Sequence, residues 1–360
     1  MKRVFIIFSL LMIQNVHSQE NPLSKIKFSG NAEIFYSFDF NQPSTHVRQP
    51  FFYTYNRHNE VNLNLAMIKA NYENEYMRAN VALMTGVYPH DNMATEEETL
   101  KIVNEANIGF RISKTKNIWI DVGIMPSHIG LEGAIGKDNL TLTRTVAIEN
   151  SPYFETGVKL SYTTDDGKWT LIGEVLNGWQ KIKRTNSSSQ MLAFGHEIIY
   201  KPNSKWLINS GSFIGKDPTT ETKLRYFHDF YAIYNPTEKL TFNFAFDFGA
   251  EQKSEGSNIY NIWWTPNLIA KYQITPKFSI SGRAEYYHDP KNVMGLSNTE
   301  HGFQIFGLST NFDYLINSNL LWRIEFRNLK SRDAIFKKID EFHPPVDNNF
   351  FITTSLSTWF

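Results

Sequence analysis

Hydrophobic and polar residues alternate along much of this 360-residue chain, most regularly between residues 240 and 249, LTFNFAFDFG. The odd positions of this stretch carry small or polar residues, and the even positions carry Leu240, Phe242, Phe244, Phe246 and Phe248. Alternation with a period of two is typical of a β-strand whose two faces meet different surroundings. The pattern therefore predicts a strand with one apolar face, and the question is what covers that face.

The same alternation recurs in about sixteen segments, each roughly ten to thirteen residues long. A tilted membrane strand needs about 9–11 residues, whereas strands of globular proteins usually have about 5–6. The registers of 59–72, which changes phase near Ala66, and of 205–215, which alternates weakly, stay open. The predicted strands cover residues 27–40, 59–72, 77–88, 102–112, 118–125, 152–163, 168–179, 191–201, 205–215, 223–234, 239–250, 258–272, 277–288, 302–314, 320–330 and 348–360.

The connections between these segments alternate between short and long. Tight polar turns lie near Asn74, Thr115, Asp166, Asn203, Pro236 and Thr275. Long connections lie between them, at residues 41–58, 89–101, 126–151, 181–190, 289–301 and 331–347. Short turns at one end and long loops at the other describe an up-and-down meander between two different environments. Residues 96–103 are the one place where we expect a short helix.

The first eighteen residues have the pattern of a cleaved signal peptide. Lys2 and Arg3 precede an apolar run over residues 4–13, and Ser18 ends a segment with the usual cleavage spacing. The rest, residues 19–360, shows no break in composition and is expected to form a single domain. The chain has no cysteine, and its 36 Lys and Arg balance 36 Asp and Glu. We therefore expect no disulfide, no thiolate metal site and no nucleic-acid partner.

Four features together indicate that the apolar faces contact lipid: long strands, alternating loop lengths, an export signal and an alternating last segment, FFITTSLSTWF. In that segment Leu356, Thr358 and the terminal Phe360 share a face, which is the pattern by which the outer-membrane assembly machinery recognises a barrel. Because lipid cannot hydrogen-bond to an open sheet edge, such a sheet must close. The predicted fold is all-β, a transmembrane antiparallel up-and-down barrel of about sixteen strands with short periplasmic turns, long extracellular loops and a lumen wide enough for water.

The stretches at 55–73, 77–88, 119–162 and 176–180 (LNGWQ) resemble the OmpL-like β-barrel porin family of Gram-negative outer membranes. The resemblance runs through most of the chain after residue 18 and is densest between about Tyr55 and Gln180. It implies a pore-forming protein of the outer membrane, surrounded by its lipid. The family offers no catalytic motif to transfer, so we expect no enzyme activity and no cofactor. A homotrimer is expected by analogy with other sixteen-stranded porins.

The resemblance also directs attention to the longest connection, 126–151, which is the third long loop. In general porins of sixteen strands this loop folds into the lumen, and its acidic groups face arginines on the wall. The alternative is that it covers the barrel mouth, and that the wall charges pair across strands and stiffen the barrel. The constriction candidates in the loop are Glu132, Lys137, Asp138, Arg144 and Glu149, and those on the wall are Arg78, Arg111, Lys159, Arg225, Arg283, Glu285, Arg323, Glu325 and Arg327.

The leading functional hypothesis is an outer-membrane porin that lets small hydrophilic solutes diffuse through this lumen. Acids and bases on the inward face roughly balance, so no strong ion preference follows. One alternative is a barrel with a structural or adhesive role. Another is a lipase or protease on the barrel wall, which needs a serine or aspartate paired with a histidine. His196 and His228 are the only histidines predicted in mid-strand, His196 on the lipid side, and the histidines lack metal-ligand spacing.

Overall fold

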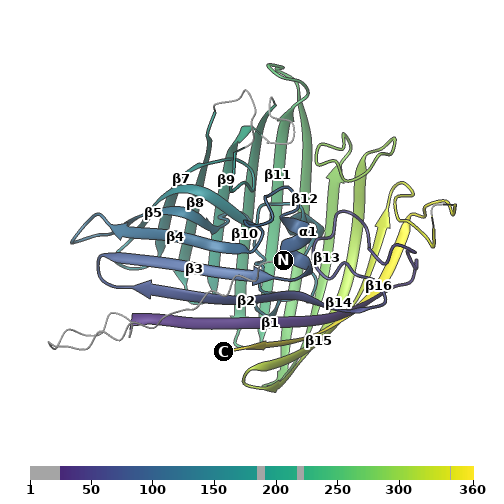
Figure 1. Cartoon of the computed structure of the whole chain (residues 1–360), viewed down its shortest axis with the longest axis horizontal. Helices are drawn as coiled ribbons and strands as arrows, with labels where there is room; N and C mark the ends of the chain where they lie inside the picture. Colours follow the sequence, from purple (N-terminus) through teal and green to yellow (C-terminus); the bar gives the residue numbers. More distant parts are fainter. Residues whose placement is uncertain (1–24, 185–190, 217–222, 341) are drawn as a thin grey trace, which may run out of the picture.

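The computed structural model describes residues 25–184, 191–216, 223–340 and 342–360, so the predicted signal peptide lies outside the described residues. Sixteen antiparallel strands form one closed barrel, in which each strand pairs with its sequence neighbours and β16 pairs with β1 (Figure 1). Their bounds are β1 (Ile26–Asp39), β2 (Val61–Glu73), β3 (Met77–Thr85), β4 (Val103–Arg111), β5 (Asn117–Pro126), β6 (Phe154–Thr163), β7 (Trp169–Leu176), β8 (Ala193–Asn203), β9 (Trp206–Lys216), β10 (Leu224–Thr237), β11 (Leu240–Gln252), β12 (Tyr260–Thr275), β13 (Phe278–Asp289), β14 (Phe303–Asn317), β15 (Leu320–Ser331) and β16 (Asn348–Trp359).

The apolar faces of the strands point outward, as the alternation predicts. On β11, Phe244, Phe246 and Phe248 keep 42%, 44% and 40% of their surface exposed. Asn243 and Asp247, which alternate with them, are buried inside the barrel. A soluble sandwich would bury the phenylalanines between two sheets. The closed barrel with an apolar outer surface confirms the predicted fold class.

The change of phase in the second predicted strand is a β-bulge. The pairing of β2 with β1 shifts by one residue opposite Glu33 and Ile34, so that Asn64 is the extra residue between Leu63 and Leu65. A bulge places two successive side chains on one face, and Asn64 and Leu65 are both fully buried. The inserted Asn64 then binds within the interior, where its amide donates to Glu33 (3.0 Å).

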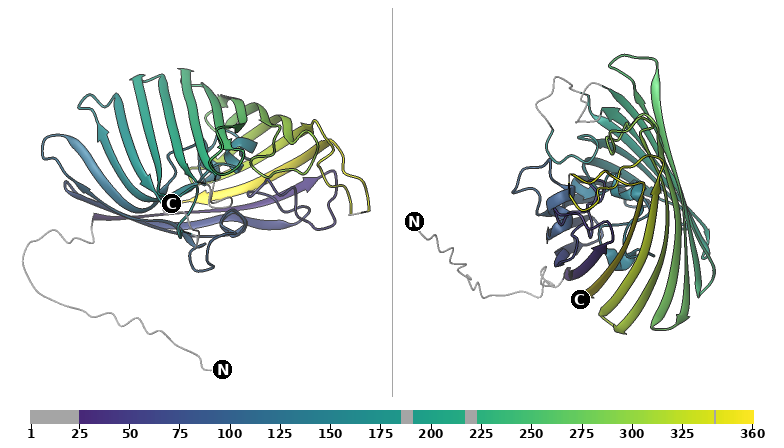
Figure 2. Two further views of the ribbon diagram at one scale, coloured as in Figure 1. Left: turned by 90° about the horizontal axis from the view of Figure 1, so that it is seen from above. Right: turned by 90° about the vertical axis from the view of Figure 1, so that its right-hand side faces the viewer.

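Among the described residues from Ile26 onward, the helical elements are three short segments: α1 (Val87–Asn92), the 3₁₀ segment η2 (Gly136–Asp138) and α2 (Val146–Glu149). Of these segments, α1 packs against β2 and β3, and α2 packs against β13. Figure 2 shows the curved sheet from two further sides. The helix expected at residues 96–103 is absent, since 93–102 has no helix and Val103 already begins β4. No helix in the described residues has the length and apolar character needed to cross a membrane.

The interior contains more apolar packing than an alternating sequence predicts. Where the long loops emerge, inward-facing residues at the strand ends pack against loop residues, among them Phe51, Phe52, Trp179 and Phe336. The strand residues in this cluster are Leu176, Ala193, Phe213, Phe227, Trp263, Tyr287, Phe303, Ile305, Leu329 and Phe351. This long-loop end of the barrel therefore contains an apolar cluster that the alternation did not predict. A second buried apolar cluster joins Leu65, Met84 and Ile124 of the wall to Tyr88 and Met93 of the second long loop.

Candidate functional site

The third long loop, residues 127–153, crosses the barrel from one wall to the other. Near its start, the backbone N–H of Gly130 donates to Asp229 on β10 (3.1 Å). Further along, Ser281 on β13 donates to the carbonyl of Leu140 (2.7 Å), and the backbone N–H of Leu142 donates to Asn311 on β14 (3.2 Å). Because β14 lies half-way round the ring from β6, to which the loop returns, the loop runs across the interior.

Two wall carboxylates bind backbone N–H groups of the loop. Glu325 on β15 accepts from both the N–H and the hydroxyl of Thr143, at 2.6 and 2.8 Å. Glu285 on β13 accepts from the N–H of Val146 at 2.8 Å, where α2 begins. These two acids therefore fix the middle of the loop and the start of its short helix to the wall, and the partial positive charge of a helix start favours a carboxylate.

Three wall arginines bind carbonyls of the same loop segment. Arg323 donates to Gly136 (2.7 Å), Arg283 to Thr143 (2.5 Å) and Arg327 to Arg144 (2.8 Å). Their side chains are at most 1% exposed within the barrel. We expected acidic loop side chains to face these arginines, whereas the loop presents backbone oxygens. The acids that balance the arginines come from the wall, since Arg283 pairs with Glu325 (2.6 Å), Arg323 with Asp313 (2.7 Å), and Arg327 with Glu285.

Two of the three acids of the loop, Glu132 and Glu149, bind within the loops themselves. Glu132 accepts from the N–H and the hydroxyl of Thr145, both at 2.8 Å, and the pKa of Glu132 is raised by burial. Glu149 accepts from the N–H of Tyr53 (2.8 Å) and the hydroxyl of Thr54, and burial likewise raises the pKa of Glu149. Glu149 therefore ties the third long loop to the first.

Arg144, one of the two cations of the loop, is fully buried. It donates to the carbonyls of Gly133 (2.7 Å) and Ala134. Its guanidinium also lies about 5 Å from the ring centres of Tyr88 and Tyr153, at 5.1 and 5.0 Å. Both arrangements favour the charged side chain at a site without free water. Arg144 thus stabilises the backbone conformation of the loop at Gly133 and Ala134.

The side chains of the other residues predicted at the constriction do not take part in the hydrogen bonds between the third long loop and β13, β14 and β15. Lys137 and Asp138 pair with one another at the loop surface (2.5 Å). On the wall, Arg78 pairs with Asp121, Arg225 pairs with Glu251 (2.6 Å), and Lys159 lies opposite Asp121 and Glu174 in the sheet register. Arg111 donates to the carbonyl of Lys116 (3.2 Å) near a short turn.

The C-terminal residues predicted as an assembly signal lie on the outer side of the closing strand. Leu356 and Phe360 are 44% and 74% exposed. The ring of Phe360 packs over Gly30 of β1, where a Cβ atom would come within 2.6 Å of it. Thr358 donates to the carbonyl of Asn319 (2.9 Å). The final aromatic residue therefore covers the seam at which the barrel closes.

A small polar cavity lies at the long-loop end, beside the apolar cluster. Its volume is about 280 Å³, and its lining includes Asp91, Thr95, Glu149, Lys181 and Arg225. Charges of both signs therefore line this opening. No sequence pattern marks this cavity, because its lining comes from five long loops and one strand end.

Acidic side chains line five strands between β6 and β11, of which β6 and β7 lie across the ring from β14 and β15. Inward positions of β6, β7, β8, β10 and β11 carry Glu155, Glu174, Glu197, Asp229 and Asp247. The acids of β6 and β7 therefore face the arginine-bearing strands across the barrel, with the third long loop between them.

Comparison with known proteins agrees with this architecture. The family model described as "Putative beta-barrel porin-2, OmpL-like" matches residues 25–360. The fold is similar to an anion-selective porin from Comamonas acidovorans, with a TM-score of 0.61 and 8% identity over 93% of this chain and 99% of that chain. It is also similar to the outer membrane channel DcaP of Acinetobacter baumannii, with a TM-score of 0.60 and 10% identity over 93% of this chain and 97% of that chain. A third similar structure is Salmonella typhi OmpF in complex with daunomycin, with a TM-score of 0.60 and 11% identity over 93% of this chain and 97% of that chain. No curated protein matches the chain by sequence.

Proposed function

The chain belongs to the OmpL-like β-barrel porin-2 family, and from this premise we propose that it lets small hydrophilic solutes diffuse passively across an outer membrane. In this proposal the lumen is narrowed by the predicted segment 126–151. The observation that carries the proposal is the set of hydrogen bonds that hold this segment against β13, β14 and β15, on the far side of the barrel from its own strands. Solutes pass between this loop and the remaining wall.

The two sides of the narrowed region carry different side chains, with acids on β6 and β7 and paired arginines on β13 and β15. Charged groups on both sides of the passage orient dipolar solutes and disfavour apolar ones. Because the arginines are paired with Glu285, Asp313 and Glu325, neither sign of ion gains a large advantage from that wall. A preference for polar, uncharged or zwitterionic solutes follows.

Entry from the long-loop end takes place through the polar cavity. The apolar cluster fills much of that end, whereas the cavity of about 280 Å³ presents charged groups of both signs, including Glu149 and Arg225. Glu149 belongs to the third long loop, so the cavity and the proposed constriction share a wall. Movement of this loop would change both.

The proposal includes location and partners. Residues 1–18 direct export and are removed, the barrel of residues 19–360 inserts into the outer membrane of a Gram-negative bacterium, and the assembly machinery binds the strand that ends in Phe360. Three barrels associate, which is supported by a fold neighbour, OmpT of Vibrio cholerae, whose title specifies a trimer form (TM-score 0.59, 8% identity).

Planar-bilayer recording of the purified protein tests the function. Stepwise openings, with currents that scale with salt concentration and little dependence on ion sign, are the expected result. Folded protein that leaves the bilayer silent would overturn the proposal and favour a structural or adhesive barrel. Solute flux into liposomes, measured by swelling with sugars of increasing size, then gives the size limit.

One observation bears on the enzymatic alternative. On the outer face of β8, β9 and β10, the hydroxyl of Ser212 lies 2.5 Å from Nδ1 of His196, and Ser210 lies 3.2 Å from Nε2 of His228. A hydrolase needs an acid or amide to orient the histidine, and no such hydrogen bond to either histidine is seen among the described residues. Phospholipid hydrolysis that disappears in His196→Ala would establish the enzyme and overturn the purely passive role.

A further inference from the structure

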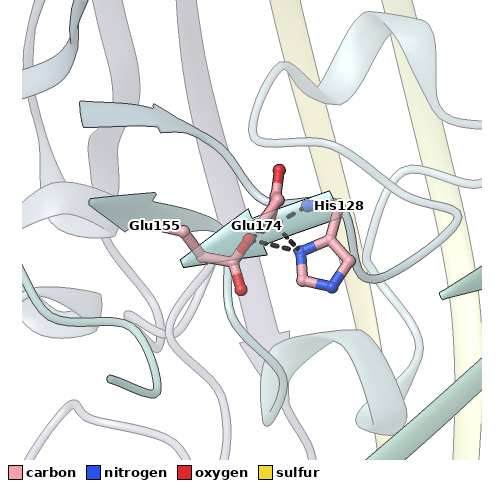
Figure 3. Close-up of side chains that lie close together, drawn as sticks. All are labelled: His128, Glu155 and Glu174. Carbon is pink, nitrogen blue, oxygen red and sulfur yellow. Dashed lines mark hydrogen bonds and ion pairs between the residues drawn. The ribbon is translucent and has the colours of Figure 1, made fainter. Parts of the chain in front are cut away.

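Three buried side chains meet where the third long loop leaves the wall. His128 lies two residues beyond β5, Glu155 is on β6 and Glu174 is on β7. Nδ1 of His128 is 2.6 Å from one oxygen of Glu155 and 2.8 Å from one oxygen of Glu174. Figure 3 shows the imidazole with this nitrogen turned towards both carboxylates. The three side chains are 1–3% exposed, so water does not screen them.

The other nitrogen of the ring fixes the protonation of His128. Nε2 lies 2.7 Å from the backbone carbonyl of Ser212. A carbonyl oxygen only accepts hydrogen bonds, so Nε2 carries a hydrogen. In neutral His128 the lone pair is then on Nδ1 and points at two carboxylates, which also present lone pairs. A proton, carried by the ring or by one of the carboxylates, or a metal ion therefore has to lie between these three atoms.

A proton leaves the cluster incompletely satisfied. One N–H on Nδ1 can point at only one oxygen, and Glu155 already receives the backbone N–H of His128 (3.2 Å). The oxygen of Glu174 that faces His128 is buried and has no hydrogen-bond partner among the described residues, and the second oxygen of Glu155 has none either. Two buried carboxylates with one imidazolium leave a net negative charge, which is costly in a buried site.

The ring is held rigidly against the wall, because two glycines of neighbouring strands make room for it. A Cβ atom at Gly195 of β8 would come within 2.7 Å of Cε1 of His128, and one at Gly211 of β9 within 3.1 Å of its carbonyl oxygen. A metal-binding histidine typically donates its second N–H to a carbonyl or carboxylate, which orients the ring. His128 meets that condition through Ser212.

We propose that His128, Glu155 and Glu174 bind one divalent transition-metal ion of the zinc class, through Nδ1 and one oxygen of each carboxylate. One imidazole and two carboxylates with a further open position form a donor set that Zn²⁺ accepts, and the nitrogen ligand disfavours Ca²⁺ and Mg²⁺. The ion replaces the proton on Nδ1 and supplies the missing positive charge. It joins the start of the third long loop to β6 and β7.

The site gives the loop a second anchor. The far half of the loop is held by Glu325, Glu285 and the wall arginines, whereas its first residues are held by His128 and Gly130. An ion at His128 therefore restrains the start of the segment that lines the proposed passage. Metal binding does not depend on conduction, so a barrel that is silent in bilayers and still binds zinc would overturn only the proposed function.

The test is a calorimetric titration of Zn²⁺ into the full-length folded barrel in detergent, after removal of bound metals with a chelator. We expect one Zn²⁺ per chain. Glu174→Gln and Glu155→Gln, which keep the side-chain size, should each weaken binding at least about tenfold. Glu105→Gln is the matched control, because Glu105 is also a buried wall acid but bonds to Lys69 on a different part of the barrel.

X-ray absorption of the bound zinc supplies a second measurement. The expected spectrum contains one imidazole and otherwise oxygen ligands, and the imidazole contribution disappears in His128→Asn. Absence of saturable Zn²⁺ binding by the folded wild-type barrel would overturn the proposal. Unchanged affinity in both glutamine variants, or complete displacement of Zn²⁺ by a modest excess of Mg²⁺ or Ca²⁺, would also overturn it.

Discussion

Thr143 and Glu325 lie 182 positions apart in the sequence, and two hydrogen bonds join them inside the barrel. One oxygen of Glu325 accepts both of these bonds, and its other oxygen accepts from Arg283 at 2.6 Å. All three side chains are buried. A single wall carboxylate therefore balances a buried arginine and holds the middle of the third long loop against β15.

Glu325→Ala should both destabilise the barrel and release the loop. Removal of one partner from a buried ion pair leaves the other charge without compensation, which costs about 3–5 kcal/mol. We expect a lower denaturant midpoint and larger, noisier single-channel currents than in the wild type. Glu300→Ala is the control, because Glu300 is exposed. A stable variant protein with wild-type currents would show that Glu325 does not hold the third long loop in its position.

Gly136→Ala tests the position of the loop without removing a charge. A Cβ atom at residue 136 would overlap the hydroxyl of Tyr55 and lie 2.7 Å from both carboxylate oxygens of Glu33. Overpacking of this kind typically costs about 1–3 kcal/mol. Because the loop is the part that can move, we expect a lower thermal midpoint and an increased conductance.

The same loop provides the control for this substitution. A Cβ atom at Gly133 would meet no atom within 4 Å. Gly133→Ala should therefore leave stability and conductance close to those of the wild type. If both alanine variants behave alike, contact of Gly136 with Tyr55 and Glu33 does not position the loop.

The strands were predictable because the direction of a side chain along a strand is a local property. Alternation alone placed Phe244 outward and Asp247 inward, and it placed Arg283, Arg323 and Arg327 on the inner wall, as the structure has them. The bulge at Asn64 appeared in the sequence only as a change of phase, because an inserted residue can flip the pattern without indicating where its partner strand shifts.

The contacts across the interior were not predictable in the same way. The arginines bind backbone carbonyls of Gly136, Thr143 and Arg144, and every residue has a carbonyl, so no side-chain pattern marks these three. The apolar cluster at the long-loop end was also missed, since Phe51 and Phe336 lie in loops where no periodicity identifies an inward face, and Trp179 follows the end of β7 at Leu176 although it was predicted inside that strand. Residues 96–103 form no helix, because the chain must already be extended where Val103 pairs with Leu83.

Asp91 on α1 should make the contact between the first and second long loops sensitive to acid. Burial opposes ionisation of Asp91, but hydrogen bonds from Arg57 (2.7 Å), His90 and Asn56 (2.8 Å) outweigh it and hold the pKa of Asp91 below its usual value of 3.8. A depressed carboxyl pKa contributes stability that is present above the unfolded pKa and is lost as pH falls through the folded pKa.

Thermal unfolding of the wild type and of Asp91→Asn at several pH values measures this contribution. Above pH 3.8 the wild type should be the more stable protein. The difference should shrink as the pH falls below that value, because the wild-type carboxyl then takes up a proton and resembles the amide. A difference that does not change with pH over this range would mean that the ionised form of Asp91 is not what stabilises the contact.

Adjacent residues on β11 test the orientation of the whole barrel relative to lipid. Phe246 points outward and is 44% exposed, whereas Ala245 points inward on the same strand. A lysine at the middle of the lipid-facing surface costs about 2–4 kcal/mol in a membrane barrel, so Phe246→Lys should lower the unfolding free energy in liposomes by that order. Ala245→Lys places the same charge on the polar inner face, near the buried carboxylate of Asp247, and should cost less.

Because both variants carry the same added charge in the same strand, only the surroundings of the two faces distinguish them. Equal destabilisation of the two variants would mean that the outer face of β11 does not contact acyl chains.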